Sequence, residues 1–398
     1  MDTSPPHSIA LRSVDDVLAA VPYLIGFHPS RSLAVVGLDR DAAVFAARVD
    51  LPPGDAADAV REMAGVMATI AARQRTTDVV IIGYGPSFHV DPAAAAAEIV
   101  LIERGFNVLE SVRVEGGRYW SYLCEGPSCC PPEGWEYDPA STEVAAAATY
   151  AGRVALPDQE ALWELVAPVT GAEGEAMRQA LRLANDRLTA TLGGGARFTR
   201  LLRRFDRDLD AALARVAVGE RLGDYAVAWL ATALTVEACC QRAWQRTSAG
   251  DHSPPRVDGG RYESLRSGTS SATCGPTGTG ARPSEAGAGA SGPPRRYRTR
   301  SGRSASGSAA RRGDRGYLEL WWELTRRAAP SPAAATLLAY AAWLAGEGAL
   351  ASAAVRRALD PPGYLPAHVM AEVLSSGVPP DEVADRLTAL RHDPDSAP

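Results

Sequence analysis

The segment at residues 33–38, LAVVGL, constrains this chain most, because it is an uninterrupted apolar run. Such a run is typical of a strand that is buried on both faces of a sheet. A polar turn at 39–41 follows it, and the alternating segment at 44–51 predicts a second strand that pairs back as a hairpin. Because a doubly buried strand needs cover on each side, we expect helices on both faces of the sheet.

The segments around this hairpin predict those helices and a further strand. Ser13 and Asp16 have the spacing of a capping box, and Pro22 is expected to end or kink the helix that follows them. Apolar residues at helical spacing predict a helix at 55–73, and the run DVVIIGY at 78–84 predicts a second buried strand. Alternation of strands and helices is the pattern of an α/β domain.

A further helix and a second hairpin complete the predicted domain. Asp91 has the position of an N-cap and Pro92 that of a first helical residue, which together predict a helix start. Strands are predicted at 107–114 and 118–124, joined by a Glu-Gly-Gly turn. We therefore predict an α/β domain over residues 9–138, with a mixed sheet sandwiched by helices.

The remainder of the chain has helical patterns. Apolar residues at helical spacing, with dense charge opposite them, predict an all-α part at 139–246 and a helical part at 317–398 that packs with it. Within the second part, two segments around Gly346 predict a helical hairpin whose pattern resembles one tetratricopeptide unit.

The segment at 247–316 has a different composition. It is rich in Gly, Ser, Pro and Arg, and holds twelve arginines against five acidic residues. Such a segment buries too little apolar surface to offset its chain entropy, so we predict a disordered insert. The arginine-rich run from Arg295 to Arg315 is expected to contact phosphates only non-specifically.

Charge and cysteine content limit the function classes. The net charge of −6 argues against a general nucleic-acid-binding protein. Residues 1–13 lack the pattern of a signal peptide, and no apolar run is long enough to span a bilayer. Six cysteines in 398 residues do not form a secreted disulfide framework. We expect a cytoplasmic protein without membrane contact.

Three cysteines with C-x4-C-C spacing form the densest group of reactive residues. Cys124, Cys129 and Cys130 follow the last predicted strand. Zinc takes four ligands, so a metal site would need a fourth, such as His28 or His89. The alternatives are buried thiols in a tight turn, a local disulfide from Cys124, or a redox-active or nucleophilic thiol.

His28, Gly83 and Gly85 are the other candidate site residues of the α/β domain. His28 lies in an elbow before the first strand, where it is either a turn residue or a general base. Gly83 and Gly85 end a buried strand, and ligands of open α/β sheets bind at the carboxyl ends of strands. A glycine turn without a ligand is the alternative.

Four aromatic residues of the helical part are a candidate partner groove, and packing in a core is the alternative explanation for them. They are Trp321, Trp322, Tyr340 and Trp343.

Three motifs resemble those of a known family. They are VPYLIGFHPS with SLAVVG at 21–37, WSYLC with CCPPEG at 120–134, and AWLAGEGAL at 342–350. Together they resemble an actinobacterial family named domain of unknown function 4192. The resemblance extends over nearly the whole chain except 247–316. It implies an intracellular protein, but it transfers no activity, cofactor or catalytic residue.

Two functions follow from these patterns. The first is a non-enzymatic interaction or regulatory protein that binds a protein partner through its helical part. The second is a small-molecule-binding or enzymatic α/β domain with a site near His28, Gly83 and Cys124. We favour the first because no complete catalytic set is present in the sequence.

Overall fold

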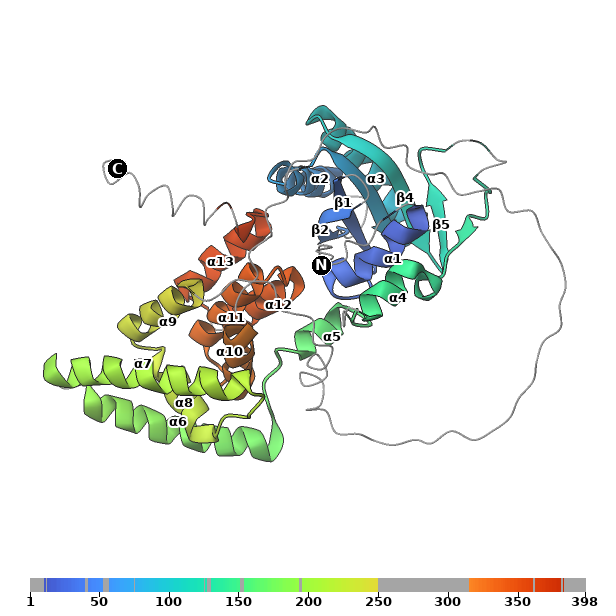
Figure 1. The fold of residues 1–398 in the computed structure, drawn as a ribbon. Helices are drawn as coiled ribbons and strands as arrows, with labels where there is room; N and C mark the ends of the chain where they lie inside the picture. The colour runs from blue at the N-terminus through green and yellow to red at the C-terminus, as the bar shows by residue number, and fades with distance from the viewer. Residues whose placement is uncertain are drawn as a thin grey trace, which may run out of the picture.

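The structure is a computed structural model, and it describes residues 11, 13–39, 42–52, 57–74, 76–124, 126, 130–150, 154–192, 195–249, 315–360, 362–380 and 382. Figure 1 shows an α/β part and a helical part side by side. No helix among these residues has the length and apolar character needed to cross a membrane.

A six-stranded sheet in the order β2-β1-β3-β4-β5-β6 forms the centre of the α/β part. Only β3 and β4 are parallel, and the other neighbours are antiparallel, so the predicted mixed sheet is confirmed. β1 is buried along nearly its whole length, as its apolar run predicted. The strands are β1 (Ser32–Asp39), β2 (Ala42–Asp50), β3 (Asp78–Tyr84), β4 (Asn107–Glu115), β5 (Arg118–Ser121) and β6 (Trp135–Glu136).

Helices cover both faces of this sheet. α2 (Ala57–Ala72) and α3 (Ser87–Glu103) pack on one face, and α1 (Val14–Ile25) packs on the other. The capping box of Ser13 and Asp16 is present at the start of α1. Two neighbouring segments extend the cover of α1, namely η1 (Pro139–Ser141) and α4 (Glu143–Tyr150). The α/β part therefore continues beyond the predicted boundary at residue 138.

Neither proline marks the helix boundary that was one expectation for it. α1 continues through Pro22 to Ile25, because Val21 and Ile25 beside it are buried in the core. Packing of this kind opposes the cost of about 3 kcal/mol that an interior proline imposes on a helix. α3 begins at Ser87 and contains Pro92, so the helix does not start at Asp91. The earlier start places Val90 against β3.

The strand predicted at 118–124 is shorter than expected. β5 ends at Ser121, and the chain returns to pair its β6 with β5. This return holds Trp120, whose Nε1 donates to the Pro132 carbonyl at 3.0 Å. A Cβ at Gly134 would lie 2.5 Å from the Trp120 ring, which requires glycine there. The segment that returns from β5 to β6 therefore fixes the position of the Trp120 side chain.

The helical part joins segments from both sides of residues 250–314. α10 packs on α7 and α8, while α11 packs on α9 and α12. α11 and α12 form the helical hairpin predicted around Gly346. The helices are α5 (Gln159–Glu164), α6 (Gly171–Thr191), α7 (Gly195–Ala217), α8 (Asp224–Ala233), α9 (Glu237–Ala249), α10 (Arg315–Arg327), α11 (Pro332–Leu344), α12 (Gly348–Leu359) and α13 (Leu365–Ser375).

The predicted insert has narrower borders than expected. α9 continues to Ala249 and α10 begins at Arg315, so both ends of the 247–316 segment are helical. Residues 250–314 lie outside the described residues, and so does most of the run from Arg295 to Arg315. The predictions of disorder and of phosphate contact there stay predictions.

Candidate functional site

The cysteine turn follows β5. Cys124 and Cys130 are half-buried and are not joined to each other by a disulfide, whereas a disulfide between Cys124 and Cys129 stays a prediction. Cys129 lies outside the described residues. Elsewhere in the described chain, no group of three or more His, Cys, Asp or Glu side chains gathers closely enough to hold a metal ion. A zinc site that includes Cys129 stays a prediction.

The two glycines at the end of β3 have packing and backbone explanations. A Cβ at Gly83 would lie 2.0 Å from Val90 Cγ1, so only glycine allows α3 to approach the strand. Gly85 has a φ of 136°, which favours glycine, and its N–H donates to the Val114 carbonyl at 3.0 Å. Close packing at Gly83 and the backbone conformation at Gly85 therefore explain both glycines without a ligand.

His28 and the cysteine turn lie in different parts of the sheet. His28 is exposed, and its backbone N–H donates to the Leu156 carbonyl at 2.9 Å. It precedes β1, whereas Cys124 follows β5, and β3 and β4 lie between these strands. Gly85 lies at the carboxyl end of β4, whereas the chain after Ser121 runs toward the amino end of that strand. The structure therefore does not bring His28, Gly83 and Cys124 into one site.

The four aromatic residues of the helical part pack inside it. Trp321 is fully buried and Trp343 is 7% exposed. Their indole N–H groups donate to Thr247 Oγ1 at 3.1 Å and to the Val378 carbonyl at 3.0 Å. Trp322 donates to the Leu165 carbonyl, and the Tyr340 hydroxyl bonds to Ser248 Oγ. The alternative of core packing therefore accounts for Trp321 and Trp343, whereas a groove that uses the half-buried Trp322 and Tyr340 stays a prediction.

A row of polar groups, which the sequence did not reveal, crosses the sheet face under α1. Ser32 faces Tyr84 across β1 and β3, and Arg48 faces the neighbouring Ala34. Ser32 Oγ, Tyr84 OH and Arg48 Nε are buried without a hydrogen-bond partner among the described residues, and so is Asp15 Oδ1 of α1. Buried polar atoms are paired in most proteins, so unpaired ones on one face of a sheet require an explanation.

The same face continues as an acidic and phenolic cluster toward β5. Glu110 is 7% exposed and accepts hydrogen bonds from Ser121 Oγ at 2.8 Å and from the Ser111 N–H at 3.0 Å. Burial raises the pKa of Tyr119, and the charges of Asp15 and Glu110 raise it further. Burial and the neighbouring Asp16 raise the pKa of Asp15. This cluster disfavours additional negative charge.

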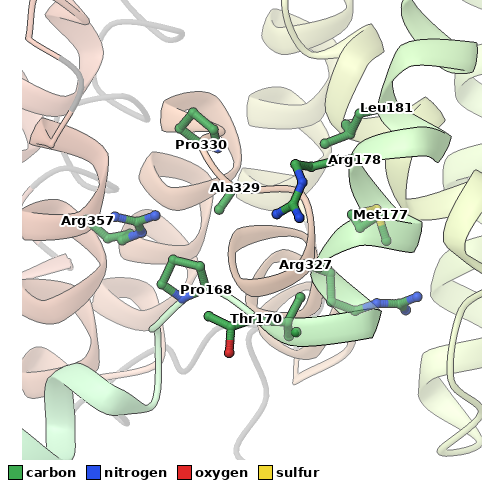
Figure 2. A pocket seen from close by; sticks show the side chains of 12 residues that line it. Pro168, Thr170, Met177, Arg178, Leu181, Arg327, Ala329, Pro330 and Arg357 are labelled. Carbon is green, nitrogen blue, oxygen red and sulfur yellow. The ribbon is translucent and has the colours of Figure 1, made fainter.

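A cleft of about 300 Å³ lies in the helical part, where α6 begins (Figure 2). Its walls come from the segment before α6, the first turns of α6, the connection between α10 and α11, and α12. It therefore combines residues from both sides of the 250–314 segment. The lining residues are Pro168, Val169, Thr170, Gly171, Gly174, Met177, Arg178, Leu181, Arg327, Ala329, Pro330 and Arg357.

Arginines determine the charge of this cleft. Figure 2 shows Arg178 and Arg357 reaching toward it from opposite sides, whereas the Arg327 guanidinium points to the far side of α6. Arg178 pairs with Glu175, which is 62% exposed, and Arg357 pairs with Asp360, which is 55% exposed. Exposed ion pairs contribute little stability, so both arginines can exchange these partners for a ligand.

The backbone at the start of α6 adds hydrogen-bond donors. The first N–H groups of a helix have no partner within it, and they carry partial positive charge. Among the described residues, the Thr170 side chain makes no capping hydrogen bond, and Gly171 is exposed, whereas Gly174 is buried and a Cβ there would lie 2.8 Å from the Val169 carbonyl oxygen. This end of α6 can therefore bind an anion together with Arg178 and Arg357.

Arg327 ties the end of α10, which lines the cleft, to the start of α8. Its guanidinium is buried and pairs with Glu323 and Asp224, and it donates to the Leu222 carbonyl at 2.7 Å. Sequence reasoning missed this site, because residues 168–178 and 327–357 are distant in the chain. The one local signal was the Thr170–Gly171 pair before an amphipathic helix.

Comparison with known proteins gives a family and nothing further. A family model with the description "Domain of unknown function (DUF4192)" matches residues 15–256 and 300–381. No curated protein and no solved structure matches the chain.

Proposed function

Because the chain belongs to the DUF4192 family, whose description names no activity, we propose a function from geometry: a non-enzymatic, regulatory binding protein that recognises a small anion in the cleft of Figure 2. The observation that carries this proposal is that Arg178 of α6 and Arg357 of α12 line the same cleft from opposite sides. Guanidinium groups bind carboxylate and phosphate oxygens with two parallel hydrogen bonds. A carboxylate or a phosphate is therefore the ligand chemistry that fits.

The position of the cleft supports a regulatory role. Arg178 lies before the 250–314 segment, and Arg357 lies after it. An anion bound to both side chains ties α6 to α12, and so changes how firmly the two helical segments hold together. The α11–α12 hairpin, which we propose to be a tetratricopeptide-type unit, supplies Arg357 to this arrangement. We place this activity in the cytoplasm.

Ligand-induced stabilisation tests the proposal. Inorganic phosphate and acetate, compared with chloride at equal ionic strength, should raise the melting temperature of the full chain, because a ligand that binds only the folded state stabilises it. A response to phosphate alone, or to acetate alone, identifies which oxyanion the cleft prefers.

Two substitutions and one control separate the cleft from general charge effects. Arg357→Gln and Arg178→Gln should each weaken binding by about ten- to a hundredfold, since a hydrogen bond to a charged group contributes about 1.5–3 kcal/mol. Arg182→Gln is the control, because Arg182 is 66% exposed on the same helix and does not line the cleft. Equal loss in all three variants would reject the site.

The polar row under α1 supports a second candidate, a polar small molecule bound to the α/β part. The four unpaired buried atoms of this row favour a neutral ligand, because the acidic cluster beside them repels anions. Native mass spectrometry of the purified full chain tests it. A bound mass that is present in the parent chain and absent from Tyr84→Phe would support this candidate. If both proteins have only the mass of the polypeptide, tight binding of a small molecule is excluded.

A further inference from the structure

An exposed apolar strip runs along α3, away from the sheet. Phe88, Ile99 and Ile102 are 65%, 59% and 55% exposed. Pro92 and Ala95 between them are also exposed, so alternating steps of four and three residues connect all five. This spacing is the apolar seam with which one helix packs against another. Such a row on a protein surface indicates a docking surface.

Acidic residues flank this strip on both sides. Helical spacing places Asp91 and Glu98 along one side and Glu103 along the other. Within the described part of the chain, Glu98 and Glu103 take part in no ion pair. A second copy of α3 would bring acids against acids in either orientation, so these charges argue against self-pairing and favour a helix with basic flanks.

The C-terminal segment leaves the described structure next to this surface. Glu382 Oε2 lies 3.6 Å from Arg73 Nη1 at the end of α2, and Gln74 Nε2 donates to the Gly377 carbonyl at 3.2 Å. The ends of α2 and α3 are neighbours, because Arg104 Nη1 donates to Thr69 Oγ1 at 2.9 Å. Figure 1 shows α13 ending beside α2.

The sequence after Glu382 has the complementary pattern. Val383, Leu387 and Leu390 repeat at steps of four and three, and Arg386 and Arg391 flank this seam on opposite sides. As a helix, residues 383–392 would extend about 15 Å. Helices in contact have axes about 8–10 Å apart, and α2 packs against α3, so a helix of this length can extend from one to the other.

From these four observations we propose that residues 383–392 form a helix that covers the exposed faces of α2 and α3, with Leu387 and Leu390 against Ile99 and Ile102. Arg386 and Arg391 then face the acids that flank the strip. The family match ends at residue 381, before this segment begins. The proposal is independent of the anion cleft, which is built from other helices.

Hydrogen exchange in the full chain tests the proposal. Leu387→Asp should remove the protection of amides in the second half of α3, because it places a charge in the seam. Ala389→Asp is the matched control, because helical spacing places Ala389 away from the seam. Equal exchange of α3 in the two variants and the parent would overturn the proposal.

Binding in trans provides the second measurement. A chain that ends at Glu382, with its fold verified by circular dichroism, should bind a peptide of residues 383–398 and regain α3 protection. Ile102→Asp should abolish this binding, whereas Leu183→Asp, at a side chain 56% exposed on α6, should not change it. Absence of binding, or a dimer whose α3 protection survives the truncation, contradicts the proposal.

Discussion

The two faces of the sheet are built from alternate residues of the same strands, but they differ in chemistry. The face under α2 and α3 is an apolar cluster that includes Leu33, Val35 and Ile81. The face under α1 shares its strands but carries Ser32 Oγ, Tyr84 OH and Arg48 Nε, which have no hydrogen-bond partner in the described part of the chain. One face of a sheet can therefore be optimised for packing while the other retains groups that cost stability, and such retained groups are a sign of function.

The largest effect is expected on the apolar face. Ile81→Ala should lower the free energy of unfolding by about 2–5 kcal/mol, because it removes a fully buried side chain and leaves a cavity. Urea denaturation measures the change. Leu183→Ala is the control, because that side chain is exposed, and a similar loss there would mean that burial does not distinguish the sites.

A smaller loss is expected where α3 approaches the sheet. Gly83→Ala should cost about 1–3 kcal/mol, because the new Cβ would lie 2.0 Å from Val90 Cγ1. Gly65→Ala in α2 should instead stabilise by about 0.5–1 kcal/mol, because its Cβ meets no atom within 4 Å. Thermal unfolding of the two variants measures both effects. A change in stability of the same sign in Gly83→Ala and Gly65→Ala would contradict the packing argument.

The face under α1 should respond in the opposite direction. Tyr84→Phe removes a buried hydroxyl that lacks a partner, so stability should rise by about 1 kcal/mol. Tyr340→Phe should lower it, because that hydroxyl bonds to Ser248 Oγ at 2.8 Å. Guanidinium chloride denaturation of both variants gives the signs. Destabilisation by Tyr84→Phe would mean that the hydroxyl has a bound partner in solution.

The smallest effect is a pH dependence at Asp15. Burial raises the pKa of this carboxyl in the folded state, so its protonated form is the stabilising one. That contribution is complete below the unfolded pKa of about 3.9 and is lost as the pH rises through the folded pKa. Asp15→Asn should therefore raise the melting temperature at pH 7 but not at pH 3.5. An equal rise in melting temperature at pH 7 and pH 3.5 would exclude titration of Asp15 as the cause.

The sequence predicted elements well where local patterns decide them. The capping box at Ser13, the apolar run of β1 and the hairpin around Gly346 all formed where expected. It misplaced a helix end at Pro22 and a helix start at Pro92, because burial of neighbouring residues overrides a local preference. It left Trp321 and Trp343 open between a groove and a core, since one helical period cannot distinguish the two, and both side chains are buried.

The candidate site was beyond sequence reasoning for a different reason. Arg178 and Arg357 have no local pattern that connects them, and only the packing of α6 near α12 brings them to one cleft. The polar row under α1 was hidden in the same way. Ser32 and Tyr84 look like ordinary strand ends until the register of β1 and β3 sets them opposite each other.

The hydrogen bond from Trp321 to Thr247 fastens together the two places where the chain departs and re-enters on either side of residues 250–314. With both anchor points fixed, the length of the connection between them changes the free energy of folding only logarithmically, by about 0.6 kcal/mol for each doubling. Evolution can therefore lengthen, shorten or exchange that connection while the helices around it keep their places.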